Sequence, residues 1–532
     1  MYRWCMRGVY VKKIVKIVVF FLKRVVYLQF EGRKEPLSML RKLFKDTVIY
    51  GIATVLPRVL TLLLTRLYVN KLDTAAFGVY SGLYVYLILG NVVLSYGMET
   101  AFFRFMNKGE RKSVVQSTAL TSLTVSSLLF MLLAYVLRNP IARWLDYDVE
   151  YIVFAILILV LDALVVIPFA WLRNKGMSKY YALLRISNVA LNLGLNLYYF
   201  SDVQVGVPSA HTGVWYIFMA NMLASLSTLV LVLPIYVKIR FSFDARLWRE
   251  MMIYAFPVLL AGIAFAVNEG FDRVFLRMLL PAETADSTIG VYSACYKMGV
   301  FMNLFVTAYK LGVEPFFFSN AQDKNAPKTY ARVTEYFIIA GGFILLFITV
   351  FTDLFKHILI PNSDYWEALW IVPVVLLANL CLGIYHSLSV WYKVTDRTTF
   401  GAVISLVGMA LTVIFNFLLI PLLSYKGAAL ATLITYMAMM LISYYYGQKY
   451  YPIPYKKRKI KFFLGMSVFF SLIDFYLLGR NIYVGVVFLL IYAVLGNAAI
   501  GGIKAIRGQR VKSRCNMPWE STRRSSCSKG TP

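Results

Sequence analysis

Long apolar stretches recur along this chain and are separated by short polar segments. A run of about 20 apolar residues is long enough to cross the hydrocarbon core of a bilayer as a helix. We predict such spans at 47–69, 79–98, 114–137, 151–172, 180–200, 213–237, 251–271, 289–311, 333–351, 368–391, 400–420, 427–447, 462–478 and 482–503. Continuous apolar runs of this length fit helices and not the alternating strands of a barrel, because backbone groups in a bilayer must bond within their own segment. The predicted fold class is therefore an all-α membrane protein with about 14 transmembrane helices.

The overall composition supports this class. Of the 532 residues, 60% are hydrophobic and 15% are charged, and the mean hydropathy is +0.66. These values exclude a soluble enzyme built around one core. The net charge of +29 comes from basic residues scattered between apolar runs, which favours anionic membrane lipids over nucleic acid as the partner. The five cysteines form no CxxC motif and predict neither a disulfide framework nor a metal site.

The number of lysine and arginine residues alternates between high and low from one predicted loop to the next. The loops after even-numbered spans hold 22 of these residues, and those after odd-numbered spans hold 8. Because basic loops stay in the cytoplasm, both termini are predicted to be cytoplasmic. Residues 1–38 form a basic extension, and two alternatives stay open: the native chain starts at Met1, or it starts at Met39 and the extension is a start-site artefact. Residues 504–532 are predicted to be a basic disordered cytoplasmic tail.

The chain also repeats itself. Gly78-Val-Tyr-Ser81 recurs at Gly290-Val-Tyr-Ser293, 212 residues or six predicted helices later. An offset of six helices preserves the direction through the membrane, so the two halves should be parallel repeats. We predict an N-terminal six-helix lobe at 39–243, a C-terminal six-helix lobe at 244–450 and an appended pair, helices 13 and 14, at 451–503.

Several short motifs accompany the repeat: Thr65-Arg66-Leu67, Phe77-Gly78-Val79-Tyr80, Phe256-Pro257, Asp272-Arg273 and Glu314-Pro315-Phe316. With these motifs the chain resembles, over about 39–503, the polysaccharide flippases of the multidrug/oligosaccharidyl-lipid/polysaccharide exporter superfamily, especially the O-antigen type. The resemblance implies two lobes around a central cavity that opens to each side of the membrane in turn. It also implies a multi-pass protein of the bacterial cytoplasmic (inner) membrane that moves a lipid-linked oligosaccharide between leaflets, with polysaccharide polymerase machinery as a partner.

Ionisable residues inside predicted spans are costly and therefore mark candidate sites. The candidate substrate-binding cations are Arg58, Arg66, Arg185 and Lys297. Arg58 is the deepest and follows Pro57, whose ring kinks a helix. Guanidinium groups suit a pyrophosphate because their planar fork donates two parallel hydrogen bonds. The alternative for Arg66, Arg185 and Lys297 is that their long side chains reach the membrane surface.

The candidate residues for ion coupling or a gate are Asp162, Glu269, Asp272 and Arg273. Asp162 either pairs with Arg58 or Arg185 or binds a coupling ion, H⁺ or Na⁺. Glu269 precedes the other two by three and four residues, so the group either forms an ion pair at the outer mouth or couples an ion.

An enzyme is disfavoured because the three histidines form no HExxH-type pairing, no Walker A lysine motif occurs and all loops are short. We predict no cofactor and no metal. The predicted function is a flippase for a polyprenyl-pyrophosphate-linked oligosaccharide. A multidrug/cation antiporter and a peptidoglycan-precursor lipid flippase of the same superfamily are the alternatives. The sugar, the coupling ion, its stoichiometry and the oligomeric state stay open.

Overall fold

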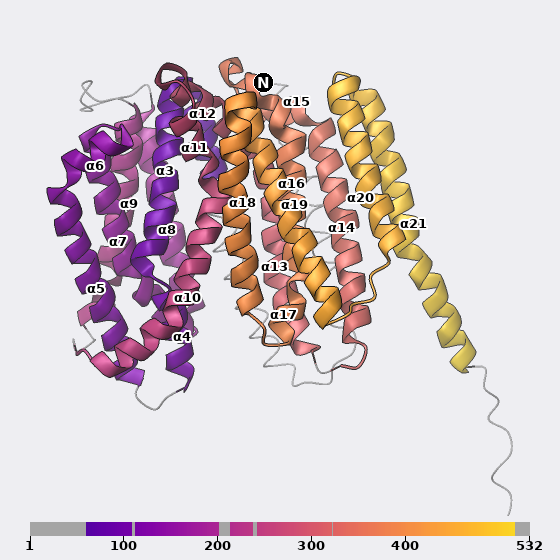
Figure 1. The fold of residues 1–532 in the computed structure, drawn as a ribbon, viewed down its shortest axis with the longest axis horizontal. Helices are drawn as coiled ribbons and strands as arrows, with labels where there is room; N and C mark the ends of the chain where they lie inside the picture. The colour runs from indigo at the N-terminus through magenta and orange to yellow at the C-terminus, as the bar shows by residue number, and fades with distance from the viewer. Residues whose placement is uncertain (1–59, 109–111, 202–212, 238–241, 322, 516–532) are drawn as a thin grey trace, which may run out of the picture.

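The computed structural model describes residues 60–108, 112–201, 213–237, 242–321 and 323–515. Regular secondary structure in these ranges is helical, without a strand. Figure 1 shows two helical bundles side by side, with the last two helices packed on the outer flank of the second bundle. The prediction of an all-α fold is confirmed.

The first bundle begins with a helical segment at 60–71. Asp73 caps the next helix, because its side chain accepts a hydrogen bond from the Ala76 amide at 2.8 Å. The helices that follow are α3 (Thr74–Ser95), α4 (Met98–Lys108), α5 (Lys112–Val136), α6 (Arg138–Leu145), α7 (Val149–Asn174), α8 (Ser178–Tyr199) and α9 (Gly213–Val237).

The second half begins with α10. The side chain of its N-cap residue, Asp244, accepts hydrogen bonds from the Arg246 and Leu247 amides. The helices of this half are α10 (Ala245–Gly270), α11 (Asp272–Leu279), α12 (Ala282–Tyr296), η1 (Lys297–Gly299), α13 (Val300–Ser319), α14 (Ala326–Val350), α15 (Thr352–Leu359), η2 (Ser363–Ile371), α16 (Val372–Leu388), α17 (Val390–Val394), α18 (Thr399–Leu423) and α19 (Tyr425–Tyr450). The appended pair consists of α20 (Lys457–Leu472), which ends in the π-helical turn η3 (Ile473–Leu477), and α21 (Ile482–Cys515).

In the described ranges, twelve helices are long and apolar enough to cross a membrane. Helix α8, at the predicted span 180–200, is not among them, because Arg185 and three asparagines reduce its apolar content. Most of the predicted span 47–69 lies outside the described residues. The chain is a multi-pass membrane protein, and the count of fourteen spans stays a prediction.

The structure also contains short helices where loops were expected. Helices α4, α6, α11 and α15 carry charged side chains on one side and apolar ones on the other, so a search for continuous apolar runs overlooks them. Helix α21 continues to Cys515, beyond the predicted span end at residue 503, and its sequence contains no proline that would stop it. Residues 516–532 of the predicted tail and the extension 1–38 lie outside the described residues.

The two recurring Gly-Val-Tyr-Ser motifs meet where α3 crosses α12. A Cβ atom on Gly78 would overlap the carbonyl oxygen of Asp286, and one on Gly290 would overlap that of Thr74. Thr74 and Asp286 are themselves 212 residues apart, so the contact is reciprocal. A pseudo-twofold axis therefore passes between α3 and α12, and only glycine permits this approach of the two backbones.

Helix α10 contacts both bundles. Its first half packs with Met251 and Ala255 into a core that includes Met98 and Phe102 of α4. Near its other end, Asn268 donates a hydrogen bond to the Ser405 carbonyl of α18 at 3.2 Å. Helix α10 thus links the bundles mechanically at two different depths.

The appended pair is attached to α14 by polar contacts. The Lys459 ammonium group forms an ion pair with Glu335, which is only 3% exposed, and donates to the Ala499 carbonyl at 2.9 Å. The Tyr492 hydroxyl donates to the Ile339 carbonyl at 3.1 Å. These contacts join α20 and α21 to the second bundle and to each other.

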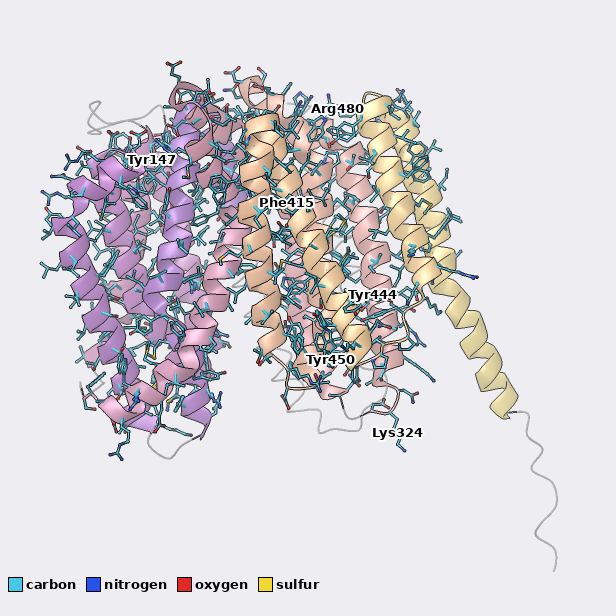
Figure 2. All side chains as sticks on the ribbon, viewed as in Figure 1. Tyr147, Lys324, Phe415, Tyr444, Tyr450 and Arg480 are labelled. Atoms are coloured by element: carbon cyan, nitrogen blue, oxygen red, sulfur yellow. The ribbon has the colours of Figure 1, made fainter. Side chains whose placement is uncertain are left out.

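The two ends of the bundle differ in charge. One end holds the loops that were counted as rich in lysine and arginine, and we call it the basic face. The other end holds α6, α11 and α15, and we call it the opposite face. Figure 2 shows Lys324 and Tyr450 toward the basic face, and Tyr147 and Arg480 at the opposite face.

Candidate functional site

The charged residues of the second half gather where α10 ends and α11 begins. A break at Phe271 turns the chain, so that Asp272 and Arg273 pair with each other at 2.9 Å. Both side chains are buried, and Arg273 Nε also donates to Ser293 Oγ at 3.1 Å. The Tyr292 hydroxyl donates to the second oxygen of Asp272. An ion pair with additional hydrogen bonds of this kind is well compensated and rigid.

Lys297 lies just below this pair, at the point where α12 gives way to α13. The single 3₁₀ turn η1 interrupts the long helical span from residue 282 to 319 at this residue. Such turns inside a helix often mark hinges or functional positions. The Lys297 ammonium group forms no hydrogen bond, and no ion pair within 4 Å, with the described residues. The charges that act on it are Arg273 and Glu269.

A buried polar layer continues from the charged group into the second bundle. Thr412 Oγ1 donates to Asn268 Oδ1 at 2.9 Å, and the Tyr436 hydroxyl donates to the Asn268 carbonyl at 3.1 Å. Asn416 donates to the Thr412 carbonyl at 2.7 Å. This layer ties α10, α18 and α19 together beside Glu269.

Asp162 is the acidic group of the first bundle. Ser225 Oγ donates to its Oδ1 at 2.8 Å, and Asn91 Nδ2 approaches its Oδ2 at 3.4 Å. Among the described residues no cation lies within 4 Å of this carboxylate, so the predicted pairing with Arg185 does not occur at ion-pair distance. Its hydrogen-bond partners are therefore the neutral groups of Ser225 and Asn91, and Arg185 acts on it only at longer range.

A row of asparagines on α8 forms the polar interior next to Asp162. Asn188, Asn192 and Asn196 are spaced four residues apart and therefore share one face of the helix. Asn196 donates to Asn192 Oδ1 at 2.7 Å and accepts from the Tyr68 hydroxyl at 3.0 Å. Our sequence analysis missed this row, although three asparagines at intervals of four in a membrane helix are a readable signal.

The predicted cations do not form one patch. Arg66 is exposed and donates to the Ile358 carbonyl at 2.8 Å, so it bridges to α15 at the opposite face. Arg185 is exposed and its guanidinium lies 4.4 Å from the centre of the Phe169 ring. Arg58 lies outside the described residues. Of the predicted substrate-binding residues that the structure describes, only Lys297 lies beside the charged group of Glu269, Asp272 and Arg273.

Hydrogen bonds join the two bundles at the opposite face. The Tyr365 hydroxyl of η2 donates to the carbonyl oxygens of Leu72 at 3.0 Å and Asp73 at 2.7 Å. Thr74 Oγ1 and Ser287 Oγ share a hydrogen bond of 2.7 Å beside the crossing of α3 and α12. Together with the reciprocal glycine contact, these bonds hold this end of the protein closed.

Arg277 of α11 adds an electrostatic bridge at the same end. Its guanidinium contacts Asp286 Oδ1 at 2.6 Å and donates to the Asp146 carbonyl of the first bundle at 2.6 Å. It also lies 3.8 Å from the centre of the Tyr147 ring. Burial raises the pKa of the Tyr147 phenol, so this side chain stays neutral under the guanidinium. Arg277 therefore links α11 of the second bundle to the segment before α7 of the first bundle at this face.

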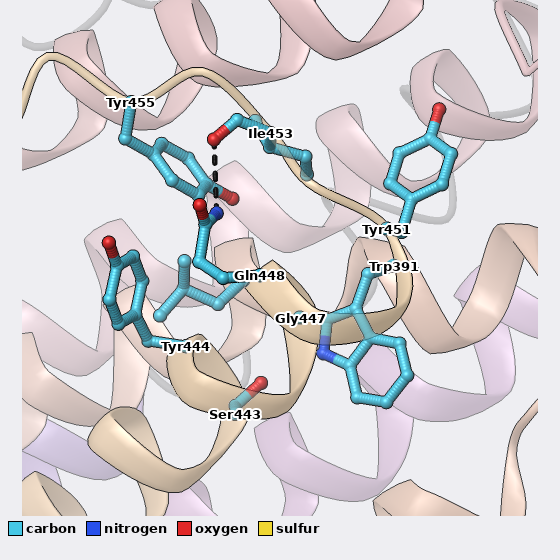
Figure 3. Close-up of a pocket in the computed structure, with 9 residues that line it drawn as sticks. Trp391, Ser443, Tyr444, Gly447, Gln448, Tyr451, Ile453 and Tyr455 are labelled. Atoms are coloured by element: carbon cyan, nitrogen blue, oxygen red, sulfur yellow. Dashed lines mark hydrogen bonds between the residues drawn. The ribbon is translucent and has the colours of Figure 1, made fainter.

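A narrow recess lies at the basic face within the second bundle. Figure 3 shows Trp391, Ser443 and Tyr444 around it, with Gln448 donating to the Ile453 carbonyl at 3.0 Å. The Trp391 indole N–H and the hydroxyls of Ser443 and Tyr444 have no hydrogen-bond partner among the described residues. Nowhere in the described ranges do three or more His, Cys, Asp or Glu residues form a group that could hold a metal ion.

Comparison with solved structures assigns the class of the fold. An inward-facing multidrug resistance MATE family transporter of the MOP superfamily aligns with a TM-score of 0.59 and 12% identity, over 76% of this chain and 94% of that one. The lipid II flippase MurJ in an inward closed conformation aligns with a TM-score of 0.62 and 15% identity, over 85% of this chain and 99% of that one. A MOP superfamily transporter from Pyrococcus furiosus aligns with a TM-score of 0.56 and 13% identity, over 76% and 95%. The chain therefore has the MOP transporter fold.

The sequence itself identifies the family. Residues 43–319, just over half of the chain, match the family described as "Polysaccharide biosynthesis protein", and the chain belongs to that family. A search of curated proteins gives no match. The predicted resemblance to the polysaccharide group of this superfamily is thus confirmed.

Proposed function

We propose that this protein is a flippase that moves a polyprenyl-pyrophosphate-linked oligosaccharide across the bacterial cytoplasmic membrane by alternating access. The exported unit would serve the assembly of a surface polysaccharide such as the O-antigen of lipopolysaccharide, with polymerase machinery acting on it afterwards. The family membership and the MOP fold support a flippase or transporter, and Lys297 supports the proposed anionic substrate class.

The observation that carries the proposal is the ammonium group of Lys297, which is unpaired among the described residues. An unpaired ammonium group within a membrane span is costly unless an anion or water compensates it. Arg273 is already neutralised by Asp272, so Lys297 is the group available to a pyrophosphate. Its place at the 3₁₀ break also lets the side chain move with the hinge between α12 and α13.

The asparagine row on α8 suits the glycan part of such a substrate. Amide groups donate and accept hydrogen bonds and therefore match sugar hydroxyls without adding charge. Asn192 and Asn221 are partly exposed and lie 3.5 Å apart across α8 and α9. We propose that the first bundle contacts the sugars while Lys297 of the second bundle contacts the pyrophosphate.

Alternating access requires a closed end in each state. The opposite face is closed by the α3–α12 crossing and by Arg277. With the basic face in the cytoplasm, as the loop charges predict, this structure would be an inward-facing or occluded state. Breaking the contacts at the opposite face would then release the substrate into the outer leaflet.

A second candidate function rests on Asp162. Its carboxylate has neutral donors only, so it suits either a coupling ion, H⁺ or Na⁺, in the flippase cycle or an organic cation in a multidrug antiporter. A peptidoglycan-precursor flippase would also bind its pyrophosphate at Lys297, and its substrate would differ only in the glycan.

The deciding experiment measures the leaflet position of the lipid-linked glycan. In a strain that lacks this protein, a fully assembled glycan should stay on the cytoplasmic leaflet, out of reach of an impermeant glycosidase. In proteoliposomes, Lys297→Ala should slow glycan transfer at least about tenfold, the effect of losing about 1.4 kcal/mol of binding energy, while Lys297→Arg retains part of it. The control is Lys324→Ala, which removes an exposed cation at the basic face.

Three other outcomes would assign a different function. Glycan that is already on the outer leaflet in the deletion strain would exclude the flippase. Unchanged glycan with raised sensitivity to cationic dyes would identify a drug antiporter. Trapped peptidoglycan precursor would identify the other flippase class.

A further inference from the structure

Asp474 is a buried carboxylate without a hydrogen-bond donor. It lies in the π-helical turn η3 at the end of α20, near the opposite face. Its side chain is 0% exposed, and neither Oδ1 nor Oδ2 has a partner among the described residues. Unsatisfied buried groups are rare in native proteins, and π-turns occur preferentially at functional positions.

Helix α21 packs closely against Asp474 at Gly485. A Cβ atom added to Gly485 would lie 3.1 Å from Asp474 Oδ1 and 2.6 Å from a methyl group of Val350. Gly485 of α21 therefore lies between Val350 of α14 and the Asp474 carboxylate. The charge that acts on Asp474 is Asp353 of α15, and the other charged or titratable residues of α15 and of the turn before α21 are Lys356, His357 and Arg480.

Asp353 forms ion pairs with both Lys356 and Arg480. Lys356 Nζ lies 2.6 Å from Asp353 Oδ1, and Arg480 Nη1 lies 3.4 Å from the same atom. Asp353 also acts on Asp474 as a like charge. An ionised Asp474 would be desolvated, unpaired and repelled by Asp353, whereas a protonated Asp474 avoids all three costs.

We propose that Asp474 is a proton-binding site, which holds H⁺ in this conformation and takes Arg480 as its ion-pair partner when the proton leaves. Arg480 is suitably placed for this exchange. Its backbone amide donates to the Asp474 carbonyl at 2.8 Å, and its φ of 63° holds the chain in a tight left-handed turn next to η3. A change of side-chain rotamer would transfer the guanidinium from Asp353 to Asp474.

The exchange would alter how the appended pair is attached. Asp353 belongs to α15 of the second bundle, and Asp474 and Arg480 belong to the appended pair. The Arg480–Asp353 contact therefore connects the two parts, whereas an Arg480–Asp474 pair would lie within the appended pair alone. Proton loss would release this connection at the opposite face. The inference concerns the proton alone and holds whatever substrate the protein carries.

Infrared difference spectroscopy on the purified full chain tests the proposal directly. Between pH 8 and pH 5 the wild-type protein should gain the carbonyl stretch of a protonated buried carboxyl group, and Asp474→Asn should lack that band. Asp148→Asn, which removes an exposed carboxylate at the same face, should retain it. A wild-type spectrum without the band, or an unchanged band in Asp474→Asn, would overturn the proposal.

Arg480→Gln provides a second test that leaves Asp474 in place, in case Asp474→Asn does not insert. Without its alternative partner the ionised form is less favourable, so the band should persist to higher pH than in the wild type. A band that disappears at the same pH in both proteins would refute the partner exchange. Because these readouts need no substrate, their outcome is independent of the flippase assignment.

Thermal unfolding adds a readout with a defined sign. An unfolded aspartate loses its proton near pH 4 (about 3.9 for the free side chain), whereas the proposal requires native Asp474 to keep it to higher pH. Wild-type stability should therefore fall relative to Asp474→Asn as the pH rises from about 4 to 8. A constant difference in unfolding temperature across this range would contradict the proposal.

Discussion

Gly78 and Gly290 occupy equivalent positions in the two repeats, and each lies directly against the backbone of the helix that carries the other. The carbonyl oxygen of Asp286 fills the space where a Gly78 side chain would begin, and that of Thr74 does the same at Gly290. The repeated motif therefore marks the axis of the molecule and its tightest contact at the opposite face.

Replacing Gly290 with alanine should weaken this closure. The added Cβ atom meets a backbone carbonyl, which cannot move without shifting α3, so we expect a cost of about 1–3 kcal/mol to the closed state. Cysteines introduced at exposed positions beside the crossing should become more accessible to an impermeant thiol reagent in Gly290→Ala. Gly312→Ala is the control, because among the described residues no atom outside its own helical backbone lies within 4 Å of its added Cβ. Equal accessibility in both variants would show that the crossing is not a gate.

Asn192→Ala should impair transport without loss of folding. The substitution removes the acceptor for Asn196 and the contact with Asn221, and each hydrogen bond is worth about 0.5–1.5 kcal/mol. If sugars bind here, the apparent affinity for the lipid-linked glycan should fall roughly 2- to 12-fold per lost bond. Leu197→Ala, on the exposed side of α8, is the matched control. Transport kinetics at equal protein level decide the matter, and an unchanged KM would place the glycan elsewhere.

Lys459→Ala should strongly destabilise the attachment of the appended pair. It leaves Glu335 buried without its cation, which costs about 3–5 kcal/mol for a buried pair. The double variant Lys459→Met with Glu335→Gln should recover most of the loss, because no unpaired charge remains. Arg173→Ala breaks an exposed ion pair with Glu99 and should cost about 0–1 kcal/mol. Unfolding temperatures of the purified proteins measure all three, and a Lys459→Ala variant as stable as the wild type would refute the prediction.

The loop at 448–461 should face the cytoplasm, because it holds six of the lysines and arginines that define the basic face. A cysteine at position 456 should resist an impermeant reagent applied to intact cells and react after permeabilisation. A cysteine at Asp364, exposed at the opposite face, should react from outside. The reverse pattern would invert the topology and with it the direction of transport.

The sequence by itself was enough to predict the all-α membrane fold and the six-helix offset, because apolar runs and the bilayer thickness leave few alternatives. It also indicated the polysaccharide group of transporters through the motifs around Gly78 and Gly290. These properties depend on local composition or on short repeated segments.

Only the tertiary structure decided which charges meet. Arg66, Arg185 and Lys297 were equivalent candidates in the sequence, yet Arg66 bridges to Ile358 at the surface, Arg185 rests on Phe169, and Lys297 alone faces the charged group at the end of α10. Asp474 lies inside the predicted span 462–478 and was overlooked among the ionisable residues, and its complete burial depends on how the end of α20 packs against α21. The helix pattern records which face of a segment is apolar, but the partner of a buried charge depends on how distant helices rotate and cross, which the local pattern does not encode.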